Sequence, residues 1–147
     1  MKKKILIIAT TITSLELFFL SHIKKLLEIY DITIISNLEN IDTFKDQKKP
    51  NLKFINLKMN RGYSLFSDFI NLIILIYYIK RENFTLSLSL TPKAGFLNCI
   101  ASFLCRTKIR IHIFTGQVWI TKQGIEKIFL KIIDKVISSL STFLLAD

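Results

Sequence analysis

The sequence has few of the residues that usually mark a cofactor or metal site. It contains 147 residues with only four glycines, two cysteines and two histidines. The first strand-to-helix loop, residues 10–13, has no glycine, which argues against the G-x-G-x-x-G fingerprint of NAD- and FAD-binding domains. Cys99 and Cys105 are six residues apart and would point to different sides of a helix, and the histidines are far apart. We therefore expect no cofactor, no disulfide and no metal site, and the free thiols fit a reducing compartment.

A membrane-spanning segment is also lacking. Half of the residues are hydrophobic and the mean hydropathy is +0.41, yet no apolar run reaches the roughly 18–20 residues that span a bilayer. Three lysines precede the apolar run Ile5–Ala9, as in a signal peptide, but the run is short and no small-residue cleavage site follows it. We interpret this run as part of the first strand.

Acidic residues are scarce. The chain has 11 acidic and 21 basic residues, which gives a formal net charge of +10. A basic, apolar-rich chain suits nucleic acid, an anionic membrane surface or a phosphorylated ligand. Nucleic acid is the weakest of these, since the lysines are scattered and no aromatic-basic recognition motif is present. The length suits one domain, and no repeat or linker divides it.

The hydrophobic pattern alternates between strands and helices. The isoleucine-rich run Lys3–Thr10 is typical of a strand that is buried on both faces of a parallel sheet. The pattern predicts further strands at 32–36, 52–57, 84–90, 109–114 and 142–146, and helices at 13–30, 65–81, 96–105 and 122–141. This order predicts an α/β fold with a Rossmann-like, doubly wound parallel sheet.

Three helices carry more specific signals. Thr13 and Glu16 have the spacing of a capping box. Helix 65–81 is wholly apolar through residues 72–79, which fits either burial against the sheet or a face in a membrane interface. The last helix has a row of lysines that is either a solvated face or an attraction to a membrane: Lys127, Lys131 and Lys135. Its predicted buried stripe comprises Ile125, Ile128, Phe129, Ile132, Ile133, Val136, Ile137 and Leu140.

The segment 91–95 is the first candidate site, because it links a strand to a helix. Thr91 suits an N-cap and Pro92 suits the first helical position. Gly95 permits a close approach by another backbone segment or a ligand. Lys93 adds a positive charge beside a helix N-terminus, where phosphates bind. The alternative is a well-capped helix with a solvated lysine.

The segment 109–119 is the second candidate, since a buried strand breaks there into a polar loop at Gly116. His112 is either a functional side chain or a neutral strand histidine with a backbone partner. After the third predicted strand, Arg61 either meets an anionic ligand or is solvated.

Three short stretches together resemble a known family. T-P-K-A-G at 91–95, R-I-H at 110–112 and F-T-G-Q-V-W at 114–119, at this spacing, resemble bacterial glycosyltransferases of family 4, which act in capsule, lipopolysaccharide or glycoprotein glycan assembly. The resemblance covers essentially the whole chain, including the closing residues 142–147. It implies the GT-B fold of two Rossmann-like domains. Residues 1–147 match the N-terminal, acceptor-side domain, with an incomplete C-terminus and without the donor-binding half.

The resemblance implies a reaction and a place for it. A sugar would pass from a nucleotide-sugar, the co-substrate that the missing half binds, to a lipid-linked (polyprenyl diphosphate) acceptor, usually with retention of configuration. The domain would lie peripherally on an anionic membrane surface, at the cytoplasmic face, without binding nucleic acid.

The resemblance also implies roles for particular residues. Acceptor phosphates would be held by Thr91, Lys93, Ala94, Gly95 and Arg61. The cleft would be lined by Thr115, Gly116, Gln117 and Trp119, with Trp119 stacking on a sugar or serving in the core. The family often has histidines where this chain has Leu88 and Leu90, which leaves His112 as the catalytic candidate.

Two alternatives stay open. The chain fits a non-catalytic, membrane-anchoring subunit that binds the acceptor and pairs with a separately encoded donor-binding domain. It also fits an inactive gene remnant. In either case we expect this chain alone to be inactive, because the resemblance places the donor site outside it.

Overall fold

The computed structural model describes residues 2–39, 49–60, 62 and 64–146. Six strands pair in parallel to form one sheet in the order β3-β2-β1-β4-β5-β6. The strands are β1 (Lys3–Thr11), β2 (Tyr30–Asn37), β3 (Leu52–Asn56), β4 (Leu86–Leu90), β5 (Ile109–Phe114) and β6 (Phe143–Ala146). The predicted Rossmann-like α/β fold is confirmed.

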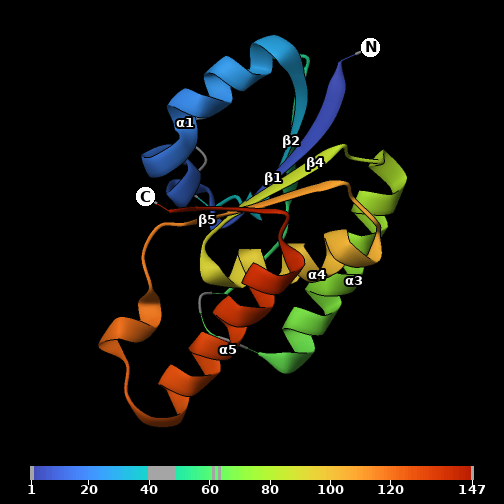
Figure 1. The fold of residues 1–147 in the computed structure, drawn as a ribbon. Helices are drawn as coiled ribbons and strands as arrows, with labels where there is room; N and C mark the ends of the chain where they lie inside the picture. The colour runs from blue at the N-terminus through green and yellow to red at the C-terminus, as the bar shows by residue number, and fades with distance from the viewer. Residues whose placement is uncertain (1, 40–48, 61, 63, 147) are drawn as a thin grey trace.

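Helices cover the two faces of this sheet unequally (Figure 1). The helices are α1 (Ile12–Ile29), α3 (Leu65–Glu82), α4 (Pro92–Leu104) and α5 (Gly124–Leu140), with a short 3-10 helix η1 (Val118–Thr121) before α5. In the described part of the chain, α1 packs on one face, whereas α3, α4 and α5 lie on the other. None of these helices combines the length and hydropathy that a membrane crossing needs.

The central strand β1 explains the two-layered core. Ile5, Ile7 and Ala9 point toward α1, and Leu6 and Ile8 point toward α3 and α4. All five side chains are buried, because neighbouring residues of a strand alternate between the two faces. The prediction of a strand buried on both sides is confirmed.

The starts of two helices differ from the prediction. Helix α1 begins at Ile12 with Thr11 as N-cap, so the proposed capping box of Thr13 and Glu16 is wrong. The helix starts earlier in the chain than predicted because Ile12 is buried in the core. Thr13 therefore lies inside the first turn. Helix α4 begins at Pro92 with Thr91 at the N-cap position, as these two residues indicate, so only the predicted range 96–105 begins four residues too late.

The predicted buried stripe of α5 is largely wrong. Helix α5 contacts α4 and the end of β5 along one narrow side, so only Leu130, Ile133 and Ile137 are buried. Four members of the predicted stripe are exposed: Ile125, Ile128, Phe129 and Ile132. Amphipathic periodicity identifies an apolar face, but it does not state how much of that face a neighbour covers.

Helix α3 packs against the domain on one side and exposes apolar residues on the other. It buries Asn71, Leu75 and Ile79, which confirms packing against the rest of the domain. Its other side exposes large apolar side chains: Leu65, Phe66, Phe69, Ile70, Ile73 and Tyr77. Contact of that side with a membrane stays a prediction.

Candidate functional site

The strand order creates a crevice at the carboxyl edge of the sheet. β1 and β4 are neighbours, but β1 continues through α1 toward β2, whereas β4 continues through α4 toward β5. Helices α1 and α4 therefore leave the sheet edge on opposite faces (Figure 1). In open α/β sheets, ligands bind at such a topological switch point.

Two threonines join the strands at the base of this crevice. The Oγ1 atoms of Thr10 and Thr91 are 2.8 Å apart, and the backbone N–H of Thr10 donates to Thr91 Oγ1 over 3.1 Å. Thr91 has φ of +68°, which is unusual for a β-branched residue. The two hydrogen bonds between Thr10 and Thr91 Oγ1 offset part of the energetic cost of this backbone conformation.

Both helices start at the crevice without a side-chain cap among the described residues. Thr91 occupies the predicted N-cap position of α4, but its hydroxyl bonds to Thr10 instead of the first turn. The N-cap of α1, Thr11, likewise pairs its hydroxyl with that of Ser14 over 3.0 Å. Free N–H groups at two helix starts favour an anion in the space between them.

The crevice is a cavity of about 680 Å³. Its described walls come from the end of β1 and the start of α1, from the β4–α4 junction, from the turn before α3, and from the segment of η1 and α5: Thr10, Thr11, Ser14, Gly62, Thr91, Pro92, Lys93, Val118, Lys122, Glu126 and Leu130. The hydroxyl-rich run at residues 10–14 was missed in the sequence. Its excess of threonine and serine at a strand end was the signal that could have identified it.

Lys93 is at the crevice wall but is held inward. Its side chain is 4% exposed, and Nζ lies 2.6 Å from Oδ1 of Asp68, whose side chain is 15% exposed. Nζ also donates to the carbonyl oxygen of Gly62 over 2.5 Å. Lys93 therefore ties the start of α4 to α3 and to the turn before α3. Arg61, the other predicted phosphate contact, lies outside the described residues.

Ala94 and Gly95 are buried in the first turn of α4, where Gly95 faces the ring of His112. A Cβ atom at Gly95 would lie 2.5 Å from His112 Nδ1 and closer still to Cε1. The close approach at Gly95 is thus made by a side chain, instead of the predicted backbone segment or ligand.

His112 is an internal side chain in this fold. It is 1% exposed, its Nδ1 lies 2.9 Å from Ser89 Oγ, and its ring meets Phe114 edge-on. Burial lowers the pKa of His112 to about 4, so the ring is neutral at pH 7. The hydrogen-bond partner is a serine side chain instead of the expected backbone group.

The low pKa of His112 predicts that the fold loses stability in mild acid. The folded pKa of about 4 lies below the unfolded value near 6.5, so the unfolded state binds the proton more tightly. The stabilisation is complete above pH 6.5 and is lost as the pH falls toward 4, by roughly 3 kcal/mol in total. Urea unfolding at several pH values measures this slope. It should persist in His22→Ala and shrink in His112→Asn; an equal slope in all three proteins would contradict the assignment.

Residues of the loop after β5 lie in different surroundings. Thr115 lines an apolar groove on the α1 side, Gly116 and Gln117 are exposed, and Val118 lines the crevice. Trp119 packs on α5, where Nε1 donates to Asp134 Oδ2 over 2.8 Å and Lys131 Nζ lies 4.6 Å from the ring centre. The structure therefore does not bring Thr115 and Trp119 together in one cleft.

Trp119 anchors the loop through Asp134. Partial burial raises the pKa of Asp134, and the hydrogen bond from Trp119 opposes that rise.

Within the described residues, no group of three or more histidine, cysteine or acidic side chains could hold a metal ion. The crevice as described offers two helix starts, hydroxyl groups and two lysines, Lys93 and Lys122, which are paired with Asp68 and Glu126. Its helix starts and hydroxyl groups suit an anionic ligand.

Part of the chain is similar in sequence to a curated protein. No protein-family model matches the chain. The chain is 31% identical over 90 residues to the capsular polysaccharide biosynthesis glycosyltransferase CapM of Staphylococcus aureus. The matched segment is 61% of this chain and 24% of CapM, so the chain spans about a quarter of that protein's length.

Solved structures share the fold at low sequence identity. A protein named as a UDP-N-acetylglucosamine 2-epimerase of Listeria monocytogenes matches 99% of this chain with a TM-score of 0.70 and 16% identity. Acinetobacter baumannii MurG matches 98% with a TM-score of 0.65 and 10% identity. This chain covers 39% and 41% of those two proteins. It therefore has the Rossmann-like fold of a GT-B enzyme domain and is similar in sequence to part of a capsule glycosyltransferase.

Proposed function

We propose that this chain is the acceptor-side domain of a glycosyltransferase that acts in surface polysaccharide assembly. The sugar would pass from a nucleotide-sugar to a lipid-diphosphate-linked acceptor, with retention of configuration. The observation that carries the proposal is the crevice between β1 and β4, where two helices without side-chain caps begin beside four hydroxyl groups.

The crevice suits a diphosphate for electrostatic reasons. Each helix start carries a partial positive charge, and its free N–H groups can donate to phosphate oxygens. Ser14 and Thr11 add hydroxyl donors. Lys122 adds a cation whose partner Glu126, at 2.8 Å, is 59% exposed, so that pair is weak and can open. The charge of Lys93 is balanced by Asp68, so Lys93 supports the crevice wall and is not counted as a phosphate contact.

The similarity to CapM supports sugar transfer as the reaction class. Because this chain covers only 24% of CapM, we place the nucleotide-sugar site on a donor-binding domain outside these 147 residues. No cofactor beyond that co-substrate enters the proposal.

The exposed side of α3 supports a peripheral position on the cytoplasmic face of the membrane. Aromatic and aliphatic side chains there can enter the interface, and a net charge of +10 attracts anionic lipids. Sedimentation with anionic vesicles that persists at high salt would indicate α3, whereas loss with salt would indicate the lysines.

A glutamate at Ser14 tests the crevice without weakening the helix. Ser14 is the third residue of α1, a position where a carboxylate favours the helix start but repels a diphosphate in the crevice. Farnesyl diphosphate should bind the wild-type chain in calorimetry, and Ser14→Glu should weaken binding about tenfold or more, which is about 1.4 kcal/mol. Ser21→Glu, on the exposed side of α1, is the matched control. Equal affinities for all three proteins, or no binding by the wild type, would exclude the crevice as the diphosphate site.

A second candidate is a non-catalytic acceptor-binding subunit. It is favoured by the burial of His112, which keeps the predicted catalytic side chain away from solvent. Turnover assays with nucleotide-sugars and a lipid-linked acceptor separate the candidates. Turnover by this chain alone would show that it holds a donor site, and turnover only with a donor-side partner would support the domain. Acceptor binding without turnover in either mixture would support the subunit, and an inactive remnant would show neither.

A further inference from the structure

The segment 117–123, which contains η1, supplies one wall of the crevice. It begins after Gly116, whose φ is +128°, and ends before Gly124, whose φ is +60°. Glycine adopts both conformations freely, and no described atom crowds a Cβ position at either glycine. None of the four residues of η1, all of which the structure describes, is buried. The position of the segment therefore depends on a few specific contacts.

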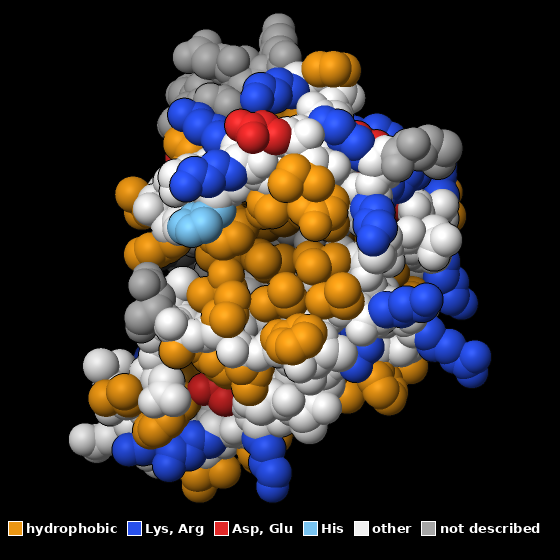
Figure 2. Space-filling model, turned by 45° about the horizontal axis from the view of Figure 1, so that its top comes forward, with side chains coloured by type: hydrophobic (Ala, Val, Ile, Leu, Met, Phe, Trp, Pro, Cys, Tyr) orange, Lys and Arg blue, Asp and Glu red, His pale blue; other side chains and the backbone are white. Residues whose placement is uncertain are grey.

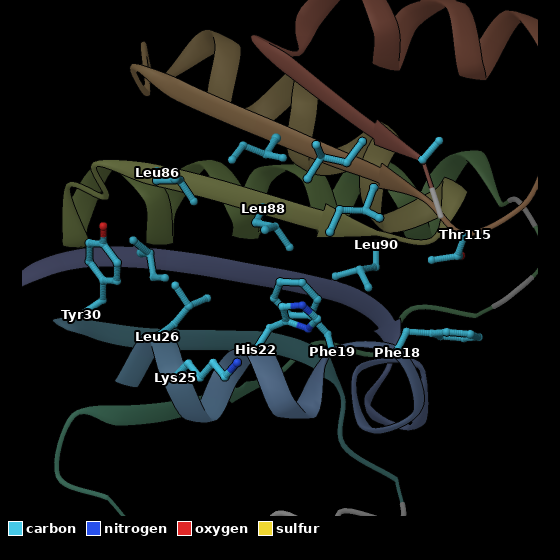
Figure 3. Close-up of a pocket in the computed structure, with 15 residues that line it drawn as sticks. Phe18, Phe19, His22, Lys25, Leu26, Tyr30, Leu86, Leu88, Leu90 and Thr115 are labelled. Atoms are coloured by element: carbon cyan, nitrogen blue, oxygen red, sulfur yellow. The ribbon is translucent and has the colours of Figure 1, made fainter. Parts of the chain in front are cut away.

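The chain passes from the α1 side of the sheet to the α5 side at Gly116. Thr115, the residue before it, lies at the end of an apolar groove between α1 and the sheet (Figure 3). Figure 2 shows this groove as a hollow in which hydrophobic side chains gather. Val118 and Lys122, by contrast, line the crevice. The residues after β5 that reach the crevice thus belong to the segment 117–123 or to α5 itself.

Trp119 attaches this segment to α5. Its indole Nε1 donates to Asp134 Oδ2 over 2.8 Å, and the Nζ atoms of Lys131 and Lys127 lie 4.6 and 5.9 Å from the ring centre. Residues 127, 131 and 134 share one side of a helix. A hydrogen bond to a carboxylate is stronger than one between neutral groups, and cations over an indole ring are attracted to it. The ring therefore has a defined place on α5.

The backbone of Trp119 carries this position to Lys122. The carbonyl oxygen of Trp119 accepts a hydrogen bond from the backbone N–H of Lys122 over 3.2 Å. Inside the same turn, the hydroxyl of Thr121 donates to the carbonyl oxygen of Val118 over 3.2 Å. A 3-10 turn is tightly wound, so a displacement of the indole would displace Lys122 as well. Trp119 is thus linked to the crevice although its own ring packs on α5.

We propose that Trp119 and Asp134 are positioning residues of the crevice, because their hydrogen bond holds Lys122 where its ammonium group can turn from Glu126 to a bound diphosphate. This inference rests on the proposed diphosphate site. It gives Trp119 a role other than stacking on a sugar: the indole acts on the ligand through Lys122.

Two substitutions at Asp134 separate the hydrogen bond from the charge. Asp134→Asn and Asp134→Leu both remove one negative charge, but only asparagine keeps an oxygen that accepts from Nε1. The change of charge by itself strengthens the attraction for an anion, equally in both variants, and leucine suits a helix better than aspartate. Farnesyl diphosphate, measured by calorimetry, should therefore bind to Asp134→Leu about threefold or more weakly than to Asp134→Asn.

A Lys122→Met background shows whether the effect passes through this lysine. There, Asp134→Asn and Asp134→Leu should bind farnesyl diphosphate equally, because substitutions of residues that act through one another are not additive. Trp119 is the only tryptophan in the chain, so acrylamide quenching of its fluorescence reports directly on its attachment. Quenching should rise in Asp134→Leu and stay near the wild-type value in Asp134→Asn.

The outcomes distinguish this inference from the proposed function. Binding by the wild type together with equal affinities of the two Asp134 variants would overturn the positioning role alone. A difference that persists in the Lys122→Met background would do the same, since the effect would then bypass the lysine, as would unchanged quenching in Asp134→Leu. No binding by the wild type would overturn the diphosphate site and the positioning role with it.

Discussion

Gly95→Ala is expected to lower the free energy of unfolding by about 1–3 kcal/mol, because the added methyl group overpacks the core. It would lie 2.5 Å from Nδ1 of His112, a ring that is fixed by Ser89 below it and by Phe114 beside it. Without this clash the same change would stabilise the protein by up to about 1 kcal/mol, since alanine is the better helix former. In urea denaturation, a lower free energy of unfolding for Gly95→Ala would therefore indicate the clash, and a higher one would indicate that there is none.

Two further proteins make the Gly95 result specific. Gly62→Ala is the matched glycine control, because nothing lies within 4 Å of a Cβ atom there, and its stability should change little. In a His112→Ala background, Gly95→Ala should become neutral or stabilising. A stabilised Gly95→Ala in the wild-type background would show that α4 and β5 do not meet as described.

Lys93→Met is expected to cost about 3–5 kcal/mol of stability, because it leaves a buried carboxylate without its cation. Lys93 and Asp68 are 4% and 15% exposed, with Nζ and Oδ1 2.6 Å apart. The same lysine donates to Gly62, so its loss also frees the turn at one wall of the crevice. Thermal and chemical unfolding measure the loss.

The exposed pair Lys122–Glu126 provides the comparison. Its side chains are 39% and 59% exposed, and Lys122→Met should cost no more than about 1 kcal/mol. Adding Asp68→Asn to Lys93→Met should restore part of the lost stability, since it removes the unpaired charge. Equal costs for Lys93→Met and Lys122→Met would mean that Lys93 is solvated, as the alternative interpretation of the sequence holds.

The fold class could be predicted from the sequence alone. Isoleucine-rich runs predicted strands buried on both faces, and the alternation with amphipathic helices predicted a doubly wound parallel sheet; both are confirmed by β1 and by the strand order. These features are local, because strand and helix periods depend on residues a few positions apart. For the same reason, Pro92 identified the start of α4 correctly at the first helical position.

The contacts of the candidate residues could not be predicted from the sequence, because they join distant parts of the chain. His112 and Gly95 are seventeen positions apart and belong to a strand and a helix, yet the missing Cβ of one makes room for the ring of the other. Lys93 meets Asp68 across twenty-five positions, and Thr10 meets Thr91 across eighty-one. A periodic pattern shows that α5 and β6 have apolar faces, but it cannot show whether another element covers them. Coverage and pairing depend on long-range packing, and that packing forms the crevice.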